Sequence, residues 1–410
     1  MTERRRIFGG TDGDLLSGNS RPAQHGDGTD QLSLAANRYR TWLMDVALPI
    51  WWSRGVNRDR GGGYHDRLGH DGLPDRVPQR LRVQARQTFV YAEAGRLGWN
   101  GPWKEAVNHG LAAVLGPHCR SDGFYRASVS AMGDPVSDDV DLYDQSFVLL
   151  CLAAGWRSIG RPRALRDAAE QLVDRLRYTL GHGRLGFEEG SPRRVPLRAN
   201  PHMHLLEAAL AWIELGVDEP FTSLADDIVA LATGHLIDRR TGAVGELFDG
   251  DWNFAAGADG RLREPGHQFE WAHLLDLHSR LVGGDKRELV HRLYRFGVDF
   301  GVERGIVLGA VDADGTPVER SSRLWAQTER LRTILTVGLD AGLATVDDAL
   351  EAVAAIDRFI PNPRSGLWYD RCRPDGLPIV DAAPASSFYH IVTAFAVLID
   401  GYCDGHSSEF

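Results

Sequence analysis

The stretch PGHQFEWAHLL, residues 265–275, places a histidine and a glutamate on an apolar helical stripe. At 100° per residue, His267, Glu270, Trp271 and Leu274 fall on one face of the predicted helix. The Trp and Leu indicate a buried stripe, where an unpaired polar group costs about 1–3 kcal/mol. Because histidine exchanges protons near neutral pH, the pair suits acid–base chemistry.

Polar side chains recur near the starts of other predicted helices. They are Arg86, Tyr143, Asn200, His204, Trp325, Gln327, Glu329 and His390. Asn200 and His204 share one stripe, whereas His202 lies about 200° away from His204 and is expected to be structural. Since a convergent polar set in a concave mouth is typical of small-molecule sites, we expect this set to line one cavity with His267 and Glu270.

Structural roles are the alternative for several of these residues. His267 and Glu270 can form an ion pair that satisfies free amides at a helix start. Arg86 can pair with an acid such as Glu93 or Glu270. Packing or a core hydrogen bond is the alternative for Tyr143, Trp325 and His390.

The sequence lacks the common metal-binding motifs. It contains neither an HExxH zinc motif nor a calcium-binding loop. A site made of three histidines on separate helices is the remaining metal alternative. We expect neither a metal nor an organic cofactor.

These residues must be positioned by helices. Periodicity predicts twelve helices, over 34–52, 79–97, 102–117, 140–156, 161–180, 201–215, 219–235, 266–282, 285–303, 322–341, 345–360 and 384–400. Short stretches rich in β-formers and Gly turns follow every odd-numbered helix, and most of them predict hairpins.

This helix–hairpin–helix unit recurs along the chain, and one unit alone cannot bury its apolar face. The repeat predicts an all-α (α/α)6 barrel with short β-hairpins at one mouth; an open solenoid of helix pairs is the alternative. The even-numbered helices are more apolar and are expected to form the inner ring.

Length and charge limit the remaining possibilities. The chain has 410 residues and a formal net charge of −10, which argues against nucleic acid or an anionic membrane as partner. We expect residues 1–30 to be a flexible tail and residues 31–410 to be a single domain. Four scattered cysteines predict free thiols, and no apolar leader or membrane span is recognised, so we expect a cytoplasmic protein.

Six short motifs, one in each predicted inner helix, resemble the N-acylglucosamine 2-epimerase superfamily. They are RVQAR (82–86), DLYDQSF (141–147), NPHMHLLEA (200–208), PGHQFEW (265–271), RLWAQTE (323–329) and SSFYH (386–390). The resemblance implies an (α/α)6 barrel in which His267 and His390 are the acid/base pair. It also implies a sugar site lined by Arg86, Tyr143, Asn200, His204, Glu270, Trp325 and Glu329, to which we add Gln327.

The residues of these motifs are most similar to those of the mannose isomerase branch. We therefore expect an aldose–ketose isomerase of the D-mannose to D-fructose type, acting on a hexose through a cis-enediol as a monomer or homodimer. His390 is expected to move the proton between C2 and C1, His267 to assist ring opening, and Arg86 to stabilise the enediolate. Glu270 is expected to orient His267.

Three alternatives stay open for the function. A sugar 2-epimerase would use the two histidines on opposite faces of C2. A glycosidase would use Glu270 and Glu329 as paired carboxylates. A binding protein would carry a dead site.

Overall fold

The computed structural model describes residues 25–183 and 185–403. The first helix, α1, begins at His25, so residues 25–30 of the expected tail are helical. The rest of that tail, residues 1–24, lies outside the described part. No helix in the described ranges is long and apolar enough to cross a bilayer. Cys119, Cys151 and Cys372 form no disulfide, as predicted.

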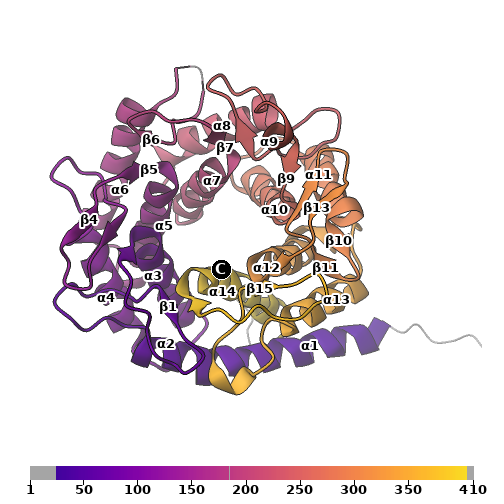
Figure 1. Cartoon of the computed structure of the whole chain (residues 1–410), viewed down its shortest axis with the longest axis horizontal. Helices are drawn as coiled ribbons and strands as arrows, with labels where there is room; N and C mark the ends of the chain where they lie inside the picture. Colours follow the sequence, from indigo (N-terminus) through magenta and orange to yellow (C-terminus); the bar gives the residue numbers. More distant parts are fainter. Residues whose placement is uncertain (1–24, 184, 404–410) are drawn as a thin grey trace, which may run out of the picture.

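An inner ring of six helices, counted over the described residues, surrounds the axis seen end-on in Figure 1. They are α3 (Leu81–Arg96), α5 (Leu142–Ser158), α7 (Ala199–Glu214), α10 (Pro265–Leu281), α12 (Leu324–Thr333) and α14 (Ala385–Tyr402). Each packs against the next along the chain, and α14 packs against α3. This contact closes the ring, which confirms the (α/α)6 barrel and excludes the open solenoid.

The odd-numbered helices of the prediction lie outside this ring, as expected from their place in the repeat, although they are not consistently more polar than the inner helices. The outer helices are α1 (His25–Trp42) with its continuation α2 (Leu48–Arg54), α4 (Trp103–Leu115), α6 (Arg163–Arg175), α8 (Phe221–Leu231), α11 (Arg287–Gly301) and α13 (Val346–Asp357). Short π-helical segments extend α1, α6, α8 and the inner α12, over Leu43–Ala47, Leu176–Leu180, Ala232–Leu236 and Ile334–Gly338. Two small helices were not predicted, α9 (Ala258–Arg261) and the 3-10 turn Pro363–Ser365.

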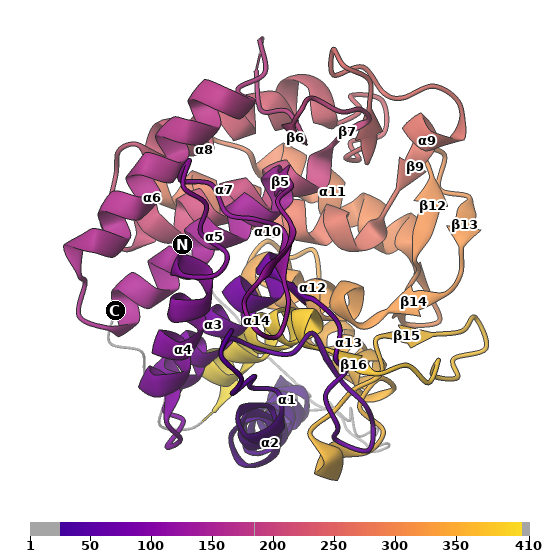
Figure 2. The same ribbon diagram turned by 60° about the vertical axis from the view of Figure 1, so that its left-hand side comes forward.

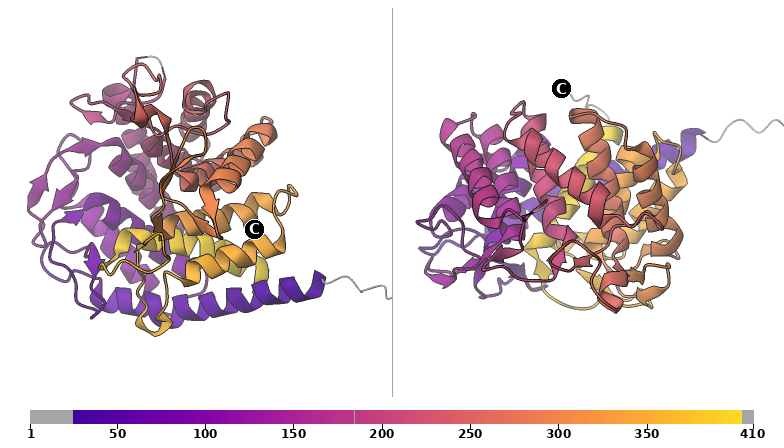
Figure 3. Two further views of the ribbon diagram at one scale, coloured as in Figure 1. Left: turned by 45° about the vertical axis from the view of Figure 1, so that its right-hand side comes forward. Right: turned by 90° about the horizontal axis from the view of Figure 1, so that it is seen from above.

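Short antiparallel strands gather at one end of the barrel (Figures 2 and 3). The pairings are β1 (Arg67–Leu68) with β16 (Ala383–Pro384), β2 (Gln79–Arg80) with β3 (Ser128–Val129), β3 with β4 (Pro135–Ser137), β5 (Val140–Asp141) with β6 (Gly190–Ser191), β7 (Leu197–Arg198) with β8 (Leu247–Phe248), β9 (Leu262–Arg263) with β12 (Ala310–Asp312), β12 with β13 (Pro317–Glu319), β14 (Ser322–Arg323) with β15 (Arg371–Cys372), and β10 (Val302–Glu303) with β11 (Ile306–Val307).

Most of these pairs are not the local hairpins that the sequence predicts. The strand that leads into each inner helix pairs with the connection of the next repeat, for example β5 before α5 with β6 before α7. The last of these pairs joins β16 before α14 to β1 of the first repeat. Backbone hydrogen bonds therefore link the six repeats into a second closed ring, above the helices.

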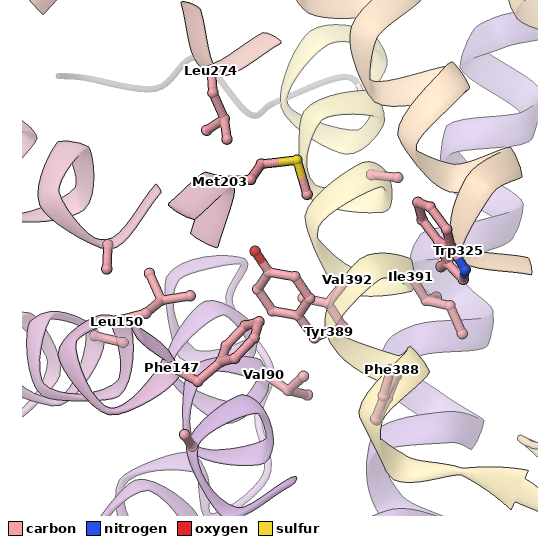
Figure 4. Packing of buried hydrophobic residues seen from close by; sticks show 14 of the residues in the cluster. Val90, Phe147, Leu150, Met203, Leu274, Trp325, Phe388, Tyr389, Ile391 and Val392 are labelled. Atoms are coloured by element: carbon pink, nitrogen blue, oxygen red, sulfur yellow. The ribbon is translucent and has the colours of Figure 1, made fainter. Parts of the chain in front are cut away.

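Buried apolar side chains fill the spaces between the helices. Figure 4 shows Phe147 of α5 facing Tyr389 of α14, with ring centroids 5.7 Å apart, and Trp325 on the other side of α14. Tyr39 of α1 stacks on Phe395 at 4.0 Å, which fastens the first outer helix to the last inner one.

A side-chain clasp fixes the preceding connection to five of the six inner helices. The fourth residue is glutamine in four of the inner helices: Gln84, Gln145, Gln268 and Gln327. Each amide accepts from the backbone N–H and donates to the carbonyl of one residue of the preceding connection; these residues are Tyr64, Tyr125, Val244 and Val307. His202 takes the same position in α7 and accepts from the backbone N–H of Phe187 over 3.0 Å.

The clasp changes the expected role of Gln327. Its side chain is fully buried, and both ends of its amide bind the backbone of Val307. The prediction that Gln327 binds substrate is therefore wrong, because the hydrogen bonds it would offer a sugar are already made. The structural reading of His202 is confirmed.

Candidate active site

One helical position recurs around the barrel axis. The sixth residues of the inner helices form a set that we call the central ring: Arg86, Phe147, His204, Glu270, Glu329 and His390. Its neighbours touch: the Arg86 guanidinium lies 4.1 Å from the Phe147 ring, and the Phe147 and His204 centroids are 4.5 Å apart. His204 Nδ1 lies 3.7 Å from Glu270 Oε1. The sequence-predicted residues of this ring do converge.

Residues one turn nearer the helix starts cover the central ring. Tyr143 and Asn200 are each the second residue of their helix. Arg86 donates to the Tyr143 hydroxyl over 2.7 Å and to the Ser386 carbonyl over 3.2 Å. Tyr143 therefore holds the guanidinium in place and is not only a packing residue.

Trp325, the second residue of α12, lies between the two proposed acid/base histidines. Its ring centroid is 5.0 Å from that of His267 and 5.8 Å from that of His390. A Cβ on Gly266 would lie 2.5 Å from the Trp325 ring, so the glycine makes room for the indole. An aromatic face between two histidines suits a sugar ring.

His267 is held by a carboxylate that the sequence did not indicate. Its Nδ1 donates to Glu246 Oε2 over 2.8 Å, and Glu264 Oε2 lies 4.0 Å away. Burial favours the neutral ring, but these two carboxylates outweigh it and raise the pKa of His267 to about 10. His267 is therefore an imidazolium at neutral pH, and its Nε2–H can act as an acid.

This partner corrects the expected role of Glu270. Glu270 lies beside His204, not at His267 Nδ1, which Glu246 occupies. Glu246 lies in the connection before α10. Other repeats have an acid at the corresponding place, which binds a backbone amide and an arginine side chain, as Asp66 does with Arg80. The repeat of that acid is the sequence signal that identifies Glu246.

His390 has the opposite protonation state. Its Nδ1 lies 2.7 Å from Glu329 Oε1, so with Nδ1–H as the donor Nε2 keeps a lone pair. Burial lowers the pKa of His390 well below 6.5, and the charge of Arg86 acts in the same direction. A neutral histidine and a protonated one around one aromatic ring have the chemistry needed for a base and an acid, respectively.

Arg86 is a buried cation without a carboxylate partner among the described residues. Its side chain is 5 % exposed. Of the acids expected as partners, Glu93 binds Arg96 and Arg157 and Glu270 faces His204. The guanidinium is therefore available to an anionic oxygen in the central ring.

Three acceptor atoms around the central ring, from two residues, make no hydrogen bond to the described protein groups. Both carboxyl oxygens of Glu270 and Oδ1 of Asn200 are buried without a hydrogen bond in the described structure. Burial and the charges of Glu329 and Glu207 raise the pKa of Glu270 well above its usual range. A neutral carboxyl group both donates and accepts, so Glu270 suits hydroxyl groups of a ligand.

A charged floor lies one turn below the central ring, and sequence reasoning missed it. Glu207 and Arg332 are each the ninth residue of their helix. Glu207 accepts from the Tyr389 hydroxyl and lies 3.0 Å from His204 Nδ1. Arg332 lies 3.4 Å from Glu329 and 3.7 Å from Glu207. Sequence spacing of three from His204 and Glu329 is the signal that could have found both residues.

Protonation differs sharply between the two acids that Arg332 contacts. Burial raises the pKa of Glu329 to about 7, although Arg332 opposes this shift. Burial also acts on Glu207, but its bonds to His204 and the charge of Arg332 outweigh it and lower the pKa of Glu207 to about 2. Glu207 is therefore a carboxylate beneath His204, with the Arg332 cation 3.7 Å away.

Three groups of described side chains have the chemistry to hold a cation. Their ligand atoms lie within 4.8 Å of one another in the sets His204–Glu207–Glu270, Glu246–Glu264–His267 and Glu270–Glu329–His390. Glu270, with two unpartnered oxygens, belongs to two of them. The same oxygens suit sugar hydroxyls, and a chelator distinguishes the two uses.

The mouth beside Trp325 contains a cavity of about 210 Å³ lined by Glu264, Arg323 and Trp325 among others. Nearby arginines are already engaged: Arg261 binds Asp312 over 2.8 Å, and Arg263 is buried and donates to the Gly260 and Leu262 carbonyls.

Known proteins share this sequence and fold. The model of the N-acylglucosamine 2-epimerase family matches residues 62–394. A mannose-6-phosphate isomerase of Rhizobium meliloti (strain 1021) is 38% identical over 90% of this chain and 98% of its own length. A D-mannose isomerase of Thermobifida fusca is 30% identical over 63% of this chain and 69% of its own length.

Among solved structures, a cellobiose 2-epimerase from Bacillus thermoamylovorans B4167 superposes with a TM-score of 0.78 at 18% identity, covering 88% of this chain and 98% of that one. At this identity the likeness shows the fold. The family match and the first relative carry the assignment: the chain belongs to the N-acylglucosamine 2-epimerase family and is a sugar isomerase of that family.

Proposed function

We propose that this protein interconverts an aldohexose and its 2-ketose, of the D-mannose to D-fructose type, by proton transfer through a cis-enediol. The opposite protonation of His267 and His390 around Trp325 is the observation that carries the proposal. The relatives include a mannose-6-phosphate isomerase and D-mannose isomerases by name, which supports a mannose-type substrate with or without a phosphate.

The reaction requires the open-chain form of the sugar. His267, as an imidazolium, donates its Nε2 proton to the ring oxygen and takes up the proton of the anomeric hydroxyl, so the ring opens to the aldehyde and His267 is again protonated. Trp325 stacks on the sugar, and Asn200 and Glu270 bind its hydroxyl groups through their unpartnered oxygens.

Proton transfer then moves hydrogen from C2 to C1. The neutral His390 takes the C2 proton through Nε2, the electron pair forms the C1–C2 double bond, and His267 donates a proton to O1. Arg86 stabilises the negative charge that develops on the enediolate oxygens. The O2 hydroxyl then returns a proton to His267 as the C2 carbonyl forms, and His390 delivers its proton to C1, so both histidines end in their starting protonation states.

A sugar 2-epimerase is the second candidate. The imidazolium of His267 could return a proton to the face of C2 opposite His390, and the structural likeness to a cellobiose 2-epimerase is compatible with that use. Both reactions share the enediolate and the same residues, and differ in which carbon is reprotonated.

NMR of D-mannose and of D-mannose 6-phosphate in D2O tests the proposal. Growth of the ketose signals is expected, with deuterium at C1 only to the extent that the proton held by His390 exchanges with solvent before it reaches C1. Growth of the C2 epimer first, without ketose, would replace the isomerase by the epimerase. In the His390→Gln variant, C2–H exchange should stop; exchange at the wild-type rate would refute the role of His390.

A further inference from the structure

A second cavity, distinct from the barrel centre, is lined by arginines from four chain segments. Its volume is about 310 Å³, and Arg304, Arg320, Arg358 and Arg373 all line it. They come from the β10–β11 turn, the β13–β14 link, the end of α13 and the turn after β15. We call it the arginine cavity.

The charge of this cavity is not balanced. Two acids, Glu303 and Asp375, also line it, so four positive and two negative groups leave a formal charge of +2. Arg320 pairs with Glu303, whereas the guanidinium groups of Arg304, Arg358 and Arg373 make no hydrogen bond or ion pair within the described structure. This local excess of positive charge contrasts with the formal net charge of −10 of the whole chain.

The backbone at Arg304 is a second, independent observation. Arg304 and Gly305 form the two-residue turn between β10 and β11, with φ of 52° and 78°. Asn-Gly is the preferred pair for such a turn, and a residue like arginine adopts positive φ at a cost of about 1–2 kcal/mol. An arginine that is unfavourable for the turn and faces a cationic cavity indicates a role for its side chain.

We propose that the arginine cavity binds a phosphorylated small molecule. A phosphate monoester carries a charge near −2 at neutral pH, which matches the excess in the cavity. The planar, multiply donating guanidinium group suits phosphate oxygens. The volume is that of a small-ligand pocket and accommodates a phosphate with a sugar-sized group. The proposal does not depend on which sugar the central ring converts.

The arginine cavity lies close to the catalytic machinery. Leu308 lines both this cavity and the one beside Trp325. Ser322, also in its wall, belongs to β14, which leads directly into α12 and hence to Trp325 and Glu329. A ligand here is therefore placed to be sensed by the helix that carries these two residues.

Calorimetric titration with inorganic phosphate, and separately with a hexose 6-phosphate, tests the proposal at constant ionic strength. The His390→Gln background keeps turnover of the sugar phosphate out of the measurement. Wild-type and His390→Gln proteins should both bind inorganic phosphate. Arg358→Gln and Arg373→Gln should each weaken that binding roughly tenfold, since each removes a charge-assisted contact.

Two further variants separate binding from folding. Arg304→Asn should weaken phosphate binding while its melting temperature stays equal or rises, because asparagine suits the turn. Arg163→Gln, on the exposed face of α6 beside Asp167, is the matched control and should bind as wild type does. Two results would overturn the proposal. One is the absence of phosphate binding at 10 mM phosphate, a concentration that corresponds to a binding free energy of only roughly 3 kcal/mol. The other is phosphate binding that the three cavity variants leave unchanged.

Discussion

Replacing Glu246 by glutamine should move the alkaline limit of activity. In the wild-type protein the pKa of His267 is about 10, because the Glu246 and Glu264 carboxylates outweigh burial. The Glu246 oxygen is only 2.8 Å from Nδ1, and an opposite charge this close shifts a pKa by about 1–3 units, or about 1.4–4 kcal/mol. The pKa of His267 should therefore fall to between about 7 and 9 in Glu246→Gln.

In the proposed mechanism the protonated form of His267 is the active one, so activity should be present below its pKa and be lost as pH rises through it. At pH 9 about nine-tenths of the wild-type His267 is protonated, against half or less in Glu246→Gln. The pH profile of kcat from pH 6 to 10.5 measures this shift. Glu264→Gln is the matched control, because Glu264 is 4.0 Å away and one-third exposed, and should shift the limit less. Equal alkaline limits in wild type and Glu246→Gln would refute the acid role of His267.

Three further predictions concern the cation, the clasp and the metal question. Arg86→Met should lower kcat by about 10²–10³, with little change in KM, because Arg86 acts on charge that develops in the enediolate. A rise in KM with kcat unchanged would instead assign Arg86 to substrate binding. His202→Gln should be neutral at pH 7.5 and stabilising at pH 5. Burial lowers the pKa of His202 to about 4, so the stability it contributes is present above pH 6.5 and falls as the unfolded chain takes up protons below it, by about 2 kcal/mol at pH 5. Denaturant unfolding at the two pH values measures this, and equal effects at both would contradict it. Exhaustive treatment with EDTA should leave the isomerase activity unchanged if the Glu270 oxygens bind hydroxyl groups; loss of activity that Mn²⁺ or Zn²⁺ restores would make the Glu270–Glu329–His390 set a metal site.

The helices and the central residues could be predicted because both follow the helical period. All twelve predicted helices are present, and the sixth-position residues His204, Glu270, Glu329 and His390 meet as predicted. Gln327 was misassigned because position on an inner helix does not reveal direction. It is two residues from Glu329, hence about 200° around the helix, and faces a connection.

The partners of the histidines depend on contacts between repeats. Glu246 reaches His267 from 21 residues earlier, through a connection whose path no periodicity describes. The strand pairs between successive repeats have the same origin, since two-residue strands carry no alternation of their own. Glu207 and Arg332 follow the helical period, but the sequence alone does not distinguish a charged pair buried at the barrel floor from one on a solvent-exposed helix face.

The closed ring of inner helices has a consequence for synthesis of the chain. The central ring takes one residue from each inner helix, from Arg86 in α3 to His390 in α14, and α14 must pack on α3 to complete it. A nascent chain in which α14 has not yet been made therefore lacks His390, and Glu329 has no partner at that position. The central ring becomes complete only when α14 packs on α3, so any activity that depends on His390 would report that the barrel has closed.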